Sequence, residues 1–231
     1  MNTRSVDSLN SFLSDVEFLM GLMAQTVLFR GQVCKGNLNP GIARPNPKED
    51  TTGKEKKVLE QFDLMGSTLL SGVPPHSLEM MVLAQHYGLR TRLLDWTSNP
   101  LAALWFACSA KTRGDAYVYS LEADNFLREG VYSKDPFSHT STRAFQPRLN
   151  NQRISAQHGW FTLHAFSKRS ACFVPLEKNS VSKKYLSEFV IPESKRYDML
   201  LSLERCGVSQ RTLFPDLDGL CGFLNMKHAL G

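Results

Sequence analysis

The sequence lacks the features that mark several common protein classes. No apolar run approaches the roughly 20 residues that a helix needs to cross a bilayer. The five cysteines are scattered, so neither a disulfide framework nor a thiolate zinc site is predicted. The histidines lack zinc-ligand spacing, and no glycine-rich phosphate loop occurs. We therefore expect no metal centre and no P-loop nucleotide site.

The amino-terminal stretch MNTRSVDSLNSF also lacks a secretion signal. It shows neither a charged-then-apolar pattern nor a small-residue cleavage site. We expect a cytoplasmic location, reduced cysteines and no membrane partner.

The composition is that of a globular protein. Hydrophobic residues make up 42% and charged residues 21% of the 231 residues. A chain of this length and composition can bury a sizeable core, as one large domain or two small ones.

Acidic residues are scarce between residues 131 and 170. This segment holds six basic residues and one acidic residue, so it accounts for the whole +5 net charge of the chain. Aromatic and histidine side chains alternate with the basic ones, a mixture that suits a phosphate backbone with stacked bases. The alternative is a solvated basic face without a ligand. The predicted nucleic-acid-binding residues are Arg143, Arg148, Arg153, His158, Trp160, Lys168 and Arg169.

Hydrophobic periodicity predicts helices near both ends of the chain and strands between them. Helices are expected at Val6–Met23, Lys54–Leu70, Ser77–Tyr87, Glu193–Cys206 and Phe214–Ala229, and strands at Thr26–Gly31, Asp115–Leu121, Gly159–His164 and Tyr185–Ile191. Residues 37–53 and 130–151 are expected to be loops. This order favours a single α+β domain.

The strongest single prediction is a core helix that starts at Asn99-Pro100. Asn is a good N-cap residue, and Pro is tolerated at the first helical position. Leu101, Leu104 and Cys108 then follow at helical spacing. The preceding stretch QHYGLRTRLLDWT is instead rich in hydrogen-bonding side chains. It is either a buried structural brace or one wall of a binding site.

Three stretches together resemble a known family. They are LFRGQ at residues 28–32, LAQHYGLRTRLLDWTSNPLAALWFA at 83–107 and RISAQHGWFTLH at 153–164. The set resembles the FRG domain, a family named for its aromatic-Arg-Gly motif, over about residues 27–220. Arg90 stands where the family usually has Pro. The resemblance implies an amino-terminal helix, residues 1–25, packed on an FRG domain at 26–231.

The order of these motifs is also similar to that of ADP-ribosyltransferases. Those enzymes have an aromatic-Arg-Gly strand, a Ser/Thr motif before a helix, and a Gln/Glu motif before a later strand. Here Phe29-Arg30-Gly31, Thr97-Ser98 and Gln157 match in that order. The resemblance implies a small mixed sheet of the ADP-ribosyltransferase type packed by helices. It also implies NAD as co-substrate, held by Phe29, Arg30, Gly31, Gln32, Arg92, Thr97 and Ser98.

The residue chemistry is compatible with such a site. A fixed Arg30 offers paired donors to a pyrophosphate or ribose, and Gly31 would let the backbone approach the ligand. Gln157 can hold a ribose hydroxyl, but it supplies neither the charge nor the base of the usual Glu. His86 titrates near neutrality and Asp95 could orient it or the substrate. Hence the predicted catalytic residues are Arg30, His86, Asp95 and Gln157, with a brace as the alternative role of Asp95.

The leading functional hypothesis is a toxin-type ADP-ribosyltransferase. It would transfer ADP-ribose from NAD to a nucleic acid, favoured to be single-stranded RNA, in a bacterial toxin–antitoxin or anti-phage system. A neutralising antitoxin protein would be its partner. Two alternatives remain: a non-catalytic nucleotide- or nucleic-acid-binding module of a defence assembly, and a metal-independent ribonuclease that uses His86.

Overall fold

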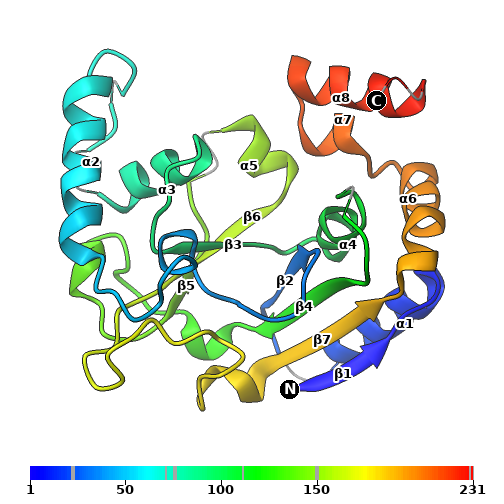
Figure 1. The fold of residues 1–231 in the computed structure, drawn as a ribbon, viewed down its shortest axis with the longest axis horizontal. Helices are drawn as coiled ribbons and strands as arrows, with labels where there is room; N and C mark the ends of the chain where they lie inside the picture. The colour runs from blue at the N-terminus through cyan, green and yellow to red at the C-terminus, as the bar shows by residue number, and fades with distance from the viewer. Residues whose placement is uncertain are drawn as a thin grey trace.

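The chain forms one α+β domain around a curled sheet. The computed structural model describes residues 1–21, 24–70, 72–74, 77–110, 112–148, 151–228 and 230. In these residues a mixed, seven-stranded sheet is packed by eight α-helices (Figure 1). The expected α+β class, with helices around a mixed sheet, is confirmed.

The strands follow the order β1-β7-β4-β2-β3-β6-β5 across the sheet. β1 pairs with β7 in parallel, and the other described pairs are antiparallel. The strands are β1 (Asn2–Ser5), β2 (Val27–Gln32), β3 (Leu93–Thr97), β4 (Ala116–Glu122), β5 (Arg143–Phe145), β6 (Gly159–Leu163) and β7 (Leu186–Ile191).

The helices are α1 (Leu9–Met20), α2 (Thr52–Gly66), α3 (Leu78–His86), α4 (Pro100–Cys108), α5 (Gln152–Ala156), α6 (Arg196–Arg205), α7 (Gln210–Leu213) and α8 (Leu217–Lys227). None of those in the described ranges has both the length and the apolar character needed to cross a membrane.

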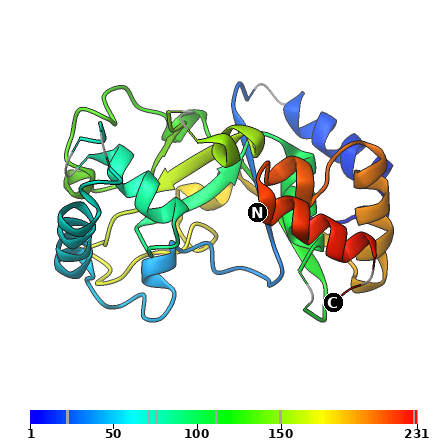
Figure 2. The same ribbon diagram turned by 90° about the horizontal axis from the view of Figure 1, so that it is seen from above.

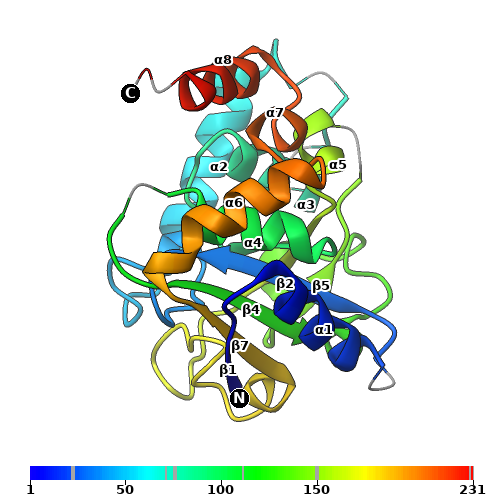
Figure 3. The same cartoon turned by 90° about the vertical axis from the view of Figure 1, so that its right-hand side faces the viewer.

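Two groups of helices cover the same face of the sheet. Phe29 of β2 is in register with Thr97 of β3, so their side chains point to one side. Phe29 packs with side chains of α1, α4 and α6. Leu93 lies four residues before Thr97 in β3, so it points to the same side, and it packs with side chains of α2 and α3. Figure 2 shows α2 at one end of the molecule and α1 and α6 at the other. Figure 3 shows α6 lying across α4.

Loops cover the opposite face of the sheet. There Trp96 and Tyr119 pack against Leu38, Phe126 and Leu176, which come from three separate connections. The sheet is therefore enclosed by helices on one face and by irregular chain on the other.

The sheet opens between β2 and β3. Each strand is fully paired on its other edge, β2 with β4 and β3 with β6. Between them only Phe29 and Thr97 are in register. Beyond that pair the two strands separate, and the ladder is replaced by a hydrogen bond from the Arg30 side chain to the Asp95 carbonyl. Polar side chains such as Arg30 therefore lie in the gap between β2 and β3, where continuous backbone pairing would leave no space for them.

Helix α4 is fixed close to this opening. Its N-cap residue Asn99 accepts the backbone N–H of Leu101 through Oδ1, and Pro100 occupies the first turn, as predicted. The helix lies so near β2 that a Cβ on Gly31 would come within 1.8 Å of the Ala103 carbonyl oxygen. The missing side chain of Gly31 thus allows α4 to pack on β2.

Several elements differ from the prediction. β3 was expected to be a polar stretch, yet Leu93, Leu94 and Trp96 are buried and form a central strand. β1 is short and largely exposed, so its sequence shows no alternation. The expected loop at 130–151 contains β5, and α5 and α7 are helices of one turn that periodicity does not reveal. The division at residue 25 remains a prediction, although β1 already belongs to the sheet.

Candidate functional site

A pocket lies where β2 and β3 separate. Its cavity has a volume of about 340 Å³. It is lined by Phe29, Arg30 and Gly31 of β2, Gln85 and His86 of α3, Asp95, Trp96 and Thr97 of β3, Phe106 of α4, and Arg153, Gln157 and Phe214. The lining includes all four predicted catalytic residues, which come from four separate elements: Arg30, His86, Asp95 and Gln157.

Arg30 is a fixed cation in this pocket. Its Nη1 donates to the Asp95 carbonyl oxygen at 2.7 Å and lies 3.8 Å from Asp95 Oδ2, and its Nε donates to Gln32 Oε1 at 3.3 Å. Burial lowers the pKa of Arg30 to about 10, although the Asp95 carboxylate opposes this shift. The guanidinium therefore stays protonated at neutral pH. Its Nη2 has no partner in the described part of the chain, so it can donate to an oxygen-rich ligand.

His86 is the last residue of α3 and is half-buried. Burial and the nearby Arg153 guanidinium lower the pKa of His86, and this outweighs the opposite effect of the Asp95 and Asp216 carboxylates. The imidazole is consequently neutral at pH 7 and can accept a proton.

Asp95 is held by Gln85 rather than by His86. Gln85 Nε2 lies 3.3 and 3.2 Å from the two carboxylate oxygens of Asp95, and Gln85 Oε1 accepts the Thr91 hydroxyl at 2.8 Å. No hydrogen bond joins Asp95 to His86 in the described residues. The carboxylate instead faces Arg30 and the solvent, and its role in orienting His86 or the substrate stays a prediction.

Gln157 stands across the pocket as a hydrogen-bonding amide. Its Nε2 donates to the Leu213 carbonyl at 3.1 Å, and its own backbone carbonyl accepts the Thr97 hydroxyl at 2.6 Å. The amide orientation is thereby fixed, and Oε1 has no donor among the described groups. This oxygen is placed to accept a ligand hydroxyl.

Phe106 and Phe214 form an apolar wall of the pocket. Their rings meet edge to face with centroids 6.0 Å apart, and Arg153 lies over the Phe214 ring. Asp216 and Asp218 form ion pairs with Arg153, so its charge is already balanced. Sequence analysis did not identify Gln85, Phe106 and Phe214. Phe106 lies in the predicted core helix and Phe214 at the start of the helix expected at Phe214–Ala229, where aromatic residues are normally interpreted as core.

Two predicted cofactor-binding residues have structural roles instead. Gly31 lines the pocket, but its missing Cβ would point at α4, so it permits helix packing rather than ligand approach. Arg92 is 2% exposed and lies outside the pocket. Its backbone N–H and Nε both donate to Glu55 of α2, at 2.7 and 2.9 Å. Arg92 is thus the buried brace that was the alternative reading of this stretch.

Of the other predicted cofactor-binding residues, some line the pocket and some do not. Phe29 and Thr97 line the pocket, Phe29 as a fully buried core residue. Gln32 holds the following loop by donating to the Cys34 and Gly36 carbonyls. Ser98 is exposed and does not line the pocket.

The predicted nucleic-acid-binding residues do not gather on one surface. Arg153 lines the pocket of Arg30 and His86, and a hollow of about 520 Å³ continues from there past His86. Arg143 lines a separate cavity, and Lys168 and Arg169 are exposed on a nearby turn. His158 is exposed next to Gln157, and Trp160 packs against the core.

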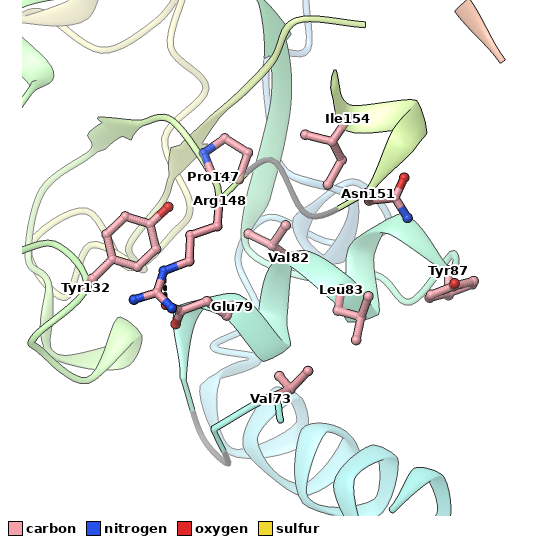
Figure 4. Close-up of a pocket in the computed structure, with 10 residues that line it drawn as sticks. All are labelled: Val73, Glu79, Val82, Leu83, Tyr87, Tyr132, Pro147, Arg148, Asn151 and Ile154. Atoms are coloured by element: carbon pink, nitrogen blue, oxygen red, sulfur yellow. Dashed lines mark ion pairs between the residues drawn. The ribbon is translucent and has the colours of Figure 1, made fainter. Parts of the chain in front are cut away.

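Arg148 belongs to a further hollow beside α3. There its Nε lies 3.4 Å from Glu79 Oε1, and Tyr132 lies next to this ion pair (Figure 4). The cavity measures about 180 Å³ and has Val82, Leu83 and Ile154 on its walls. Because Glu79 balances the charge of Arg148, Arg148 adds little to a continuous basic face.

No metal centre is evident in the described residues, because no group of three or more His, Cys, Asp or Glu side chains is placed to hold an ion. The five cysteines are free thiols. Burial raises the pKa of Cys108 to about 12, which keeps that thiol protonated.

Comparison with known proteins gives one family match. The sequence profile described as the FRG domain matches residues 25–116. No curated protein matches the chain, and no solved structure does. The matched range contains Arg30, His86 and Asp95, whereas Gln157 and Phe214 lie beyond it. The match is therefore shorter than the resemblance over about residues 27–220 that the motifs indicate. This chain therefore carries an FRG domain over residues 25–116.

Proposed function

We propose that the pocket binds NAD and transfers its ADP-ribose group to a nucleic acid. The observation that supports this most is the convergence of Arg30, His86, Asp95 and Gln157, drawn from distant parts of the chain, on one cavity. Phe29-Arg30-Gly31, Thr97-Ser98 and Gln157 also follow one another along the chain in the order of the ADP-ribosyltransferase motifs. The proposed fold relationship to those enzymes rests on that order.

The donor set suits the chemical groups of NAD. The free Nη2 of Arg30 would hold a pyrophosphate or ribose oxygen, and Gln157 Oε1 would accept a ribose hydroxyl. Phe106 and Phe214 offer an apolar wall for the nicotinamide ring. The hollow continuing past His86 and Arg153 gives the remainder of a long ligand room to extend.

The reaction breaks the bond between the nicotinamide nitrogen and ribose C1′, and a nucleophile of the acceptor forms the new bond to C1′. His86, neutral at pH 7, would take the proton that the nucleophile loses. Asp95, which is 57% exposed, would stabilise positive charge at the sugar centre and supply the negative charge that Gln157 lacks. In this division of roles Gln157 orients the ribose.

We further propose single-stranded RNA as the acceptor and, from the family resemblance, a toxin role in a toxin–antitoxin or anti-phage system with a neutralising protein partner. Tyr87, which is exposed beside His86, is available for stacking with an acceptor base.

Incubation with NAD labelled in its adenylate phosphate and with single-stranded RNA tests the proposal. Wild-type protein should release nicotinamide and transfer label to RNA. Arg30→Ala should reduce turnover by at least about 100-fold, because the pocket loses its fixed cation. Arg113→Ala, which removes a cation distant from this pocket, serves as the matched control and should leave turnover unchanged.

The same experiment separates the alternatives. RNA cleavage without NAD would indicate the ribonuclease, and NAD or RNA binding without turnover would indicate the non-catalytic module. Full turnover by a folded Arg30→Ala variant would contradict the proposed site.

A further inference from the structure

A second polar cavity lies on the loop-covered side of the molecule and shares no lining residue with the candidate site. Its volume is about 540 Å³. Its walls come from three connections, at residues 125–128, 140–143 and 164–182. Trp96 and His164 link the two regions, because Trp96 lines the first pocket, His164 lines this one, and both bond the Thr162 hydroxyl.

The charged lining of this cavity is entirely cationic. Arg128, Arg143 and Lys178 line it, and no carboxylate does. None of the three forms an ion pair within the described residues. A cavity with three cations and no counter-charge of its own attracts an anion.

Three carboxylates adjoin lining residues in the chain, and none of them lines the cavity: Glu129 is exposed, and Asp124 and Glu177 bind other segments. Asp124 accepts the backbone N–H groups of Gln25 and Thr26, at 2.8 and 2.9 Å. Glu177 accepts those of Asn37 and Leu38, at 2.8 and 3.1 Å. Asp124 and Glu177 are thereby engaged with other segments, and no ion pair joins a neighbouring carboxylate to the three cations in the described residues.

The remaining polar lining is rich in hydroxyl groups. Thr140, Ser141 and Thr142 lie on one wall, and Ser167, Ser170, Ser180 and Ser182 on the others. Hydroxyl and guanidinium donors together are the groups that proteins place around phosphate oxygens. A cationic ligand would find no counter-charge in this lining.

His164 adds a buried donor to the cavity wall. It is 3% exposed, and its Nε2 lies 2.9 Å from the Thr162 hydroxyl. Trp96 can only donate to that hydroxyl, so the Thr162 proton is free to bond Nε2. Burial and the charges of Arg30 and Arg92 lower the pKa of His164 to about 3, so the ring is neutral. The ring proton then resides on Nδ1, which has no partner among the described residues.

A tight turn places two more cations at the rim. The backbone N–H groups of Ser167 and Cys172 bond each other's carbonyls and close the turn. Lys168 and Arg169, both exposed, lie between the lining residues Ser167 and Ser170. The cationic character of the cavity therefore extends outward along this turn.

We propose that this cavity binds a phosphate group, carried either by a free nucleotide or by a nucleic acid strand. Arg143 and Lys178 supply the charge, the hydroxyl groups supply further donors, and His164 Nδ1–H bonds the innermost oxygen. The assignment is independent of NAD turnover, so it can hold or fail separately from the proposed function.

Binding of two probes without NAD tests it: adenosine diphosphate by calorimetry, and a fluorescein-labelled short oligouridylate by anisotropy. The double variant Arg143→Ala/Lys178→Ala should weaken binding by about tenfold or more at fixed ionic strength, because charge-assisted hydrogen bonds are lost. The control Lys195→Ala/Arg205→Ala removes the same charge at the two ends of α6, from the residue before it and from its last residue, and should change affinity less than about twofold. Weakened binding of the diphosphate identifies a free nucleotide as ligand, and weakened binding of the oligouridylate alone identifies a strand.

The His164 ring gives a second readout in the unmodified protein. The ¹⁵N resonance of Nδ1 should shift when the probe that binds is added, and this shift should be absent in the Arg143→Ala/Lys178→Ala protein. Equal weakening by the control variant, or binding without a shift at His164, would overturn the assignment. So would failure of both probes to bind the wild-type protein.

Discussion

Gly31 illustrates how one residue of the family motif acts through packing. Its Cα faces the backbone of α4, where an added Cβ would lie 1.8 Å from the Ala103 oxygen and 2.6 Å from the Ala107 nitrogen. These neighbours are main-chain atoms, so no side-chain rearrangement can relieve the clash.

Gly31→Ala should therefore destabilise the fold by about 3 kcal/mol or more, at or above the upper end of the usual overpacking range. Gly53→Ala is the matched control, since nothing lies within 4 Å of an added Cβ there and the residue is in α2. The control should be neutral or more stable by up to about 1 kcal/mol. Urea unfolding of both variants provides the comparison, and equal stabilities would contradict the packing role.

The protonation of His86 depends on a neighbour from a different element. Arg153 lowers the pKa of His86, whereas Asp95 and Asp216 raise it. Asp216 is itself paired with Arg153. Removing the guanidinium therefore ends its repulsion of the protonated imidazole and leaves the Asp216 carboxylate free to attract it.

Arg153→Ala should consequently raise the pKa of His86. The proton-accepting form would then be lost at a higher pH, and the acidic limb of any activity profile would move in the same direction. An NMR titration of the His86 ring measures the shift directly. Arg148→Ala, which removes an exposed cation paired with Glu79, should leave the titration unaltered. An unchanged or lowered pKa in Arg153→Ala would refute this electrostatic account.

At the scale of elements, a buried ion pair joins α2 to Arg92, the residue immediately before β3. Glu55 and Arg92 are each 2% exposed, and the Thr52 hydroxyl and the Phe137 ring also contact the guanidinium. Burial raises the pKa of Glu55 despite the opposite effect of Arg92, so the carboxylate depends on its partner.

Removing one partner should cost about 3–5 kcal/mol of unfolding free energy, since the other charge stays buried and unpaired. The double variant Glu55→Leu/Arg92→Met should be more stable than Arg92→Met alone, because no isolated charge remains. Thermal or urea denaturation tests the order. A double variant no more stable than Arg92→Met would show that the pair itself supplies net stabilisation.

The elements that sequence could predict are those with strong local signals. α4 was predictable from the cap at Asn99 and the apolar spacing, and β2, β4, β6 and β7 from short β-branched or aromatic runs. β3 was not, because its side chains serve two different environments: Asp95 faces the site, while Leu94 and Trp96 lie in the core. β1 exists only through pairing with β7, which local sequence does not encode.

The site was partly predictable for a related reason. Motif order indicated Arg30 and Gln157, and residue chemistry indicated His86, before any distance was known. The role of Arg92 could not be separated from a ligand contact, because its partner Glu55 lies 37 residues away. Phe106 and Phe214 were missed because a pocket wall and a core position have the same sequence signature.

At the scale of the whole molecule, folding disperses the basic segment. Of the basic residues between 131 and 170, Arg153 lines the pocket, Arg143 the second cavity and Arg148 the hollow beside α3. A single basic face is therefore replaced by separate sites, of which only the second cavity lacks acidic neighbours in its lining.

Global stability should depend on pH through His164. Its pKa falls from 6.5 to about 3 on folding, so the unfolded chain binds a proton that the folded chain rejects. Its contribution is complete above pH 6.5 and is lost as the pH falls toward 3, with a slope approaching about 1.4 kcal/mol per pH unit. His164→Gln should remove that slope from the pH dependence of the unfolding free energy. Identical slopes in both proteins would show that His164 is not held neutral.

The most direct measurement of the central claim is a crystal structure of the protein with an NAD analogue that resists cleavage. The account predicts the nicotinamide riboside between Arg30, His86 and Gln157, with the ring against Phe106 and Phe214 and a ribose hydroxyl on Gln157 Oε1. A ligand bound only elsewhere, or an analogue that fails to bind at all, would contradict the assignment of this pocket.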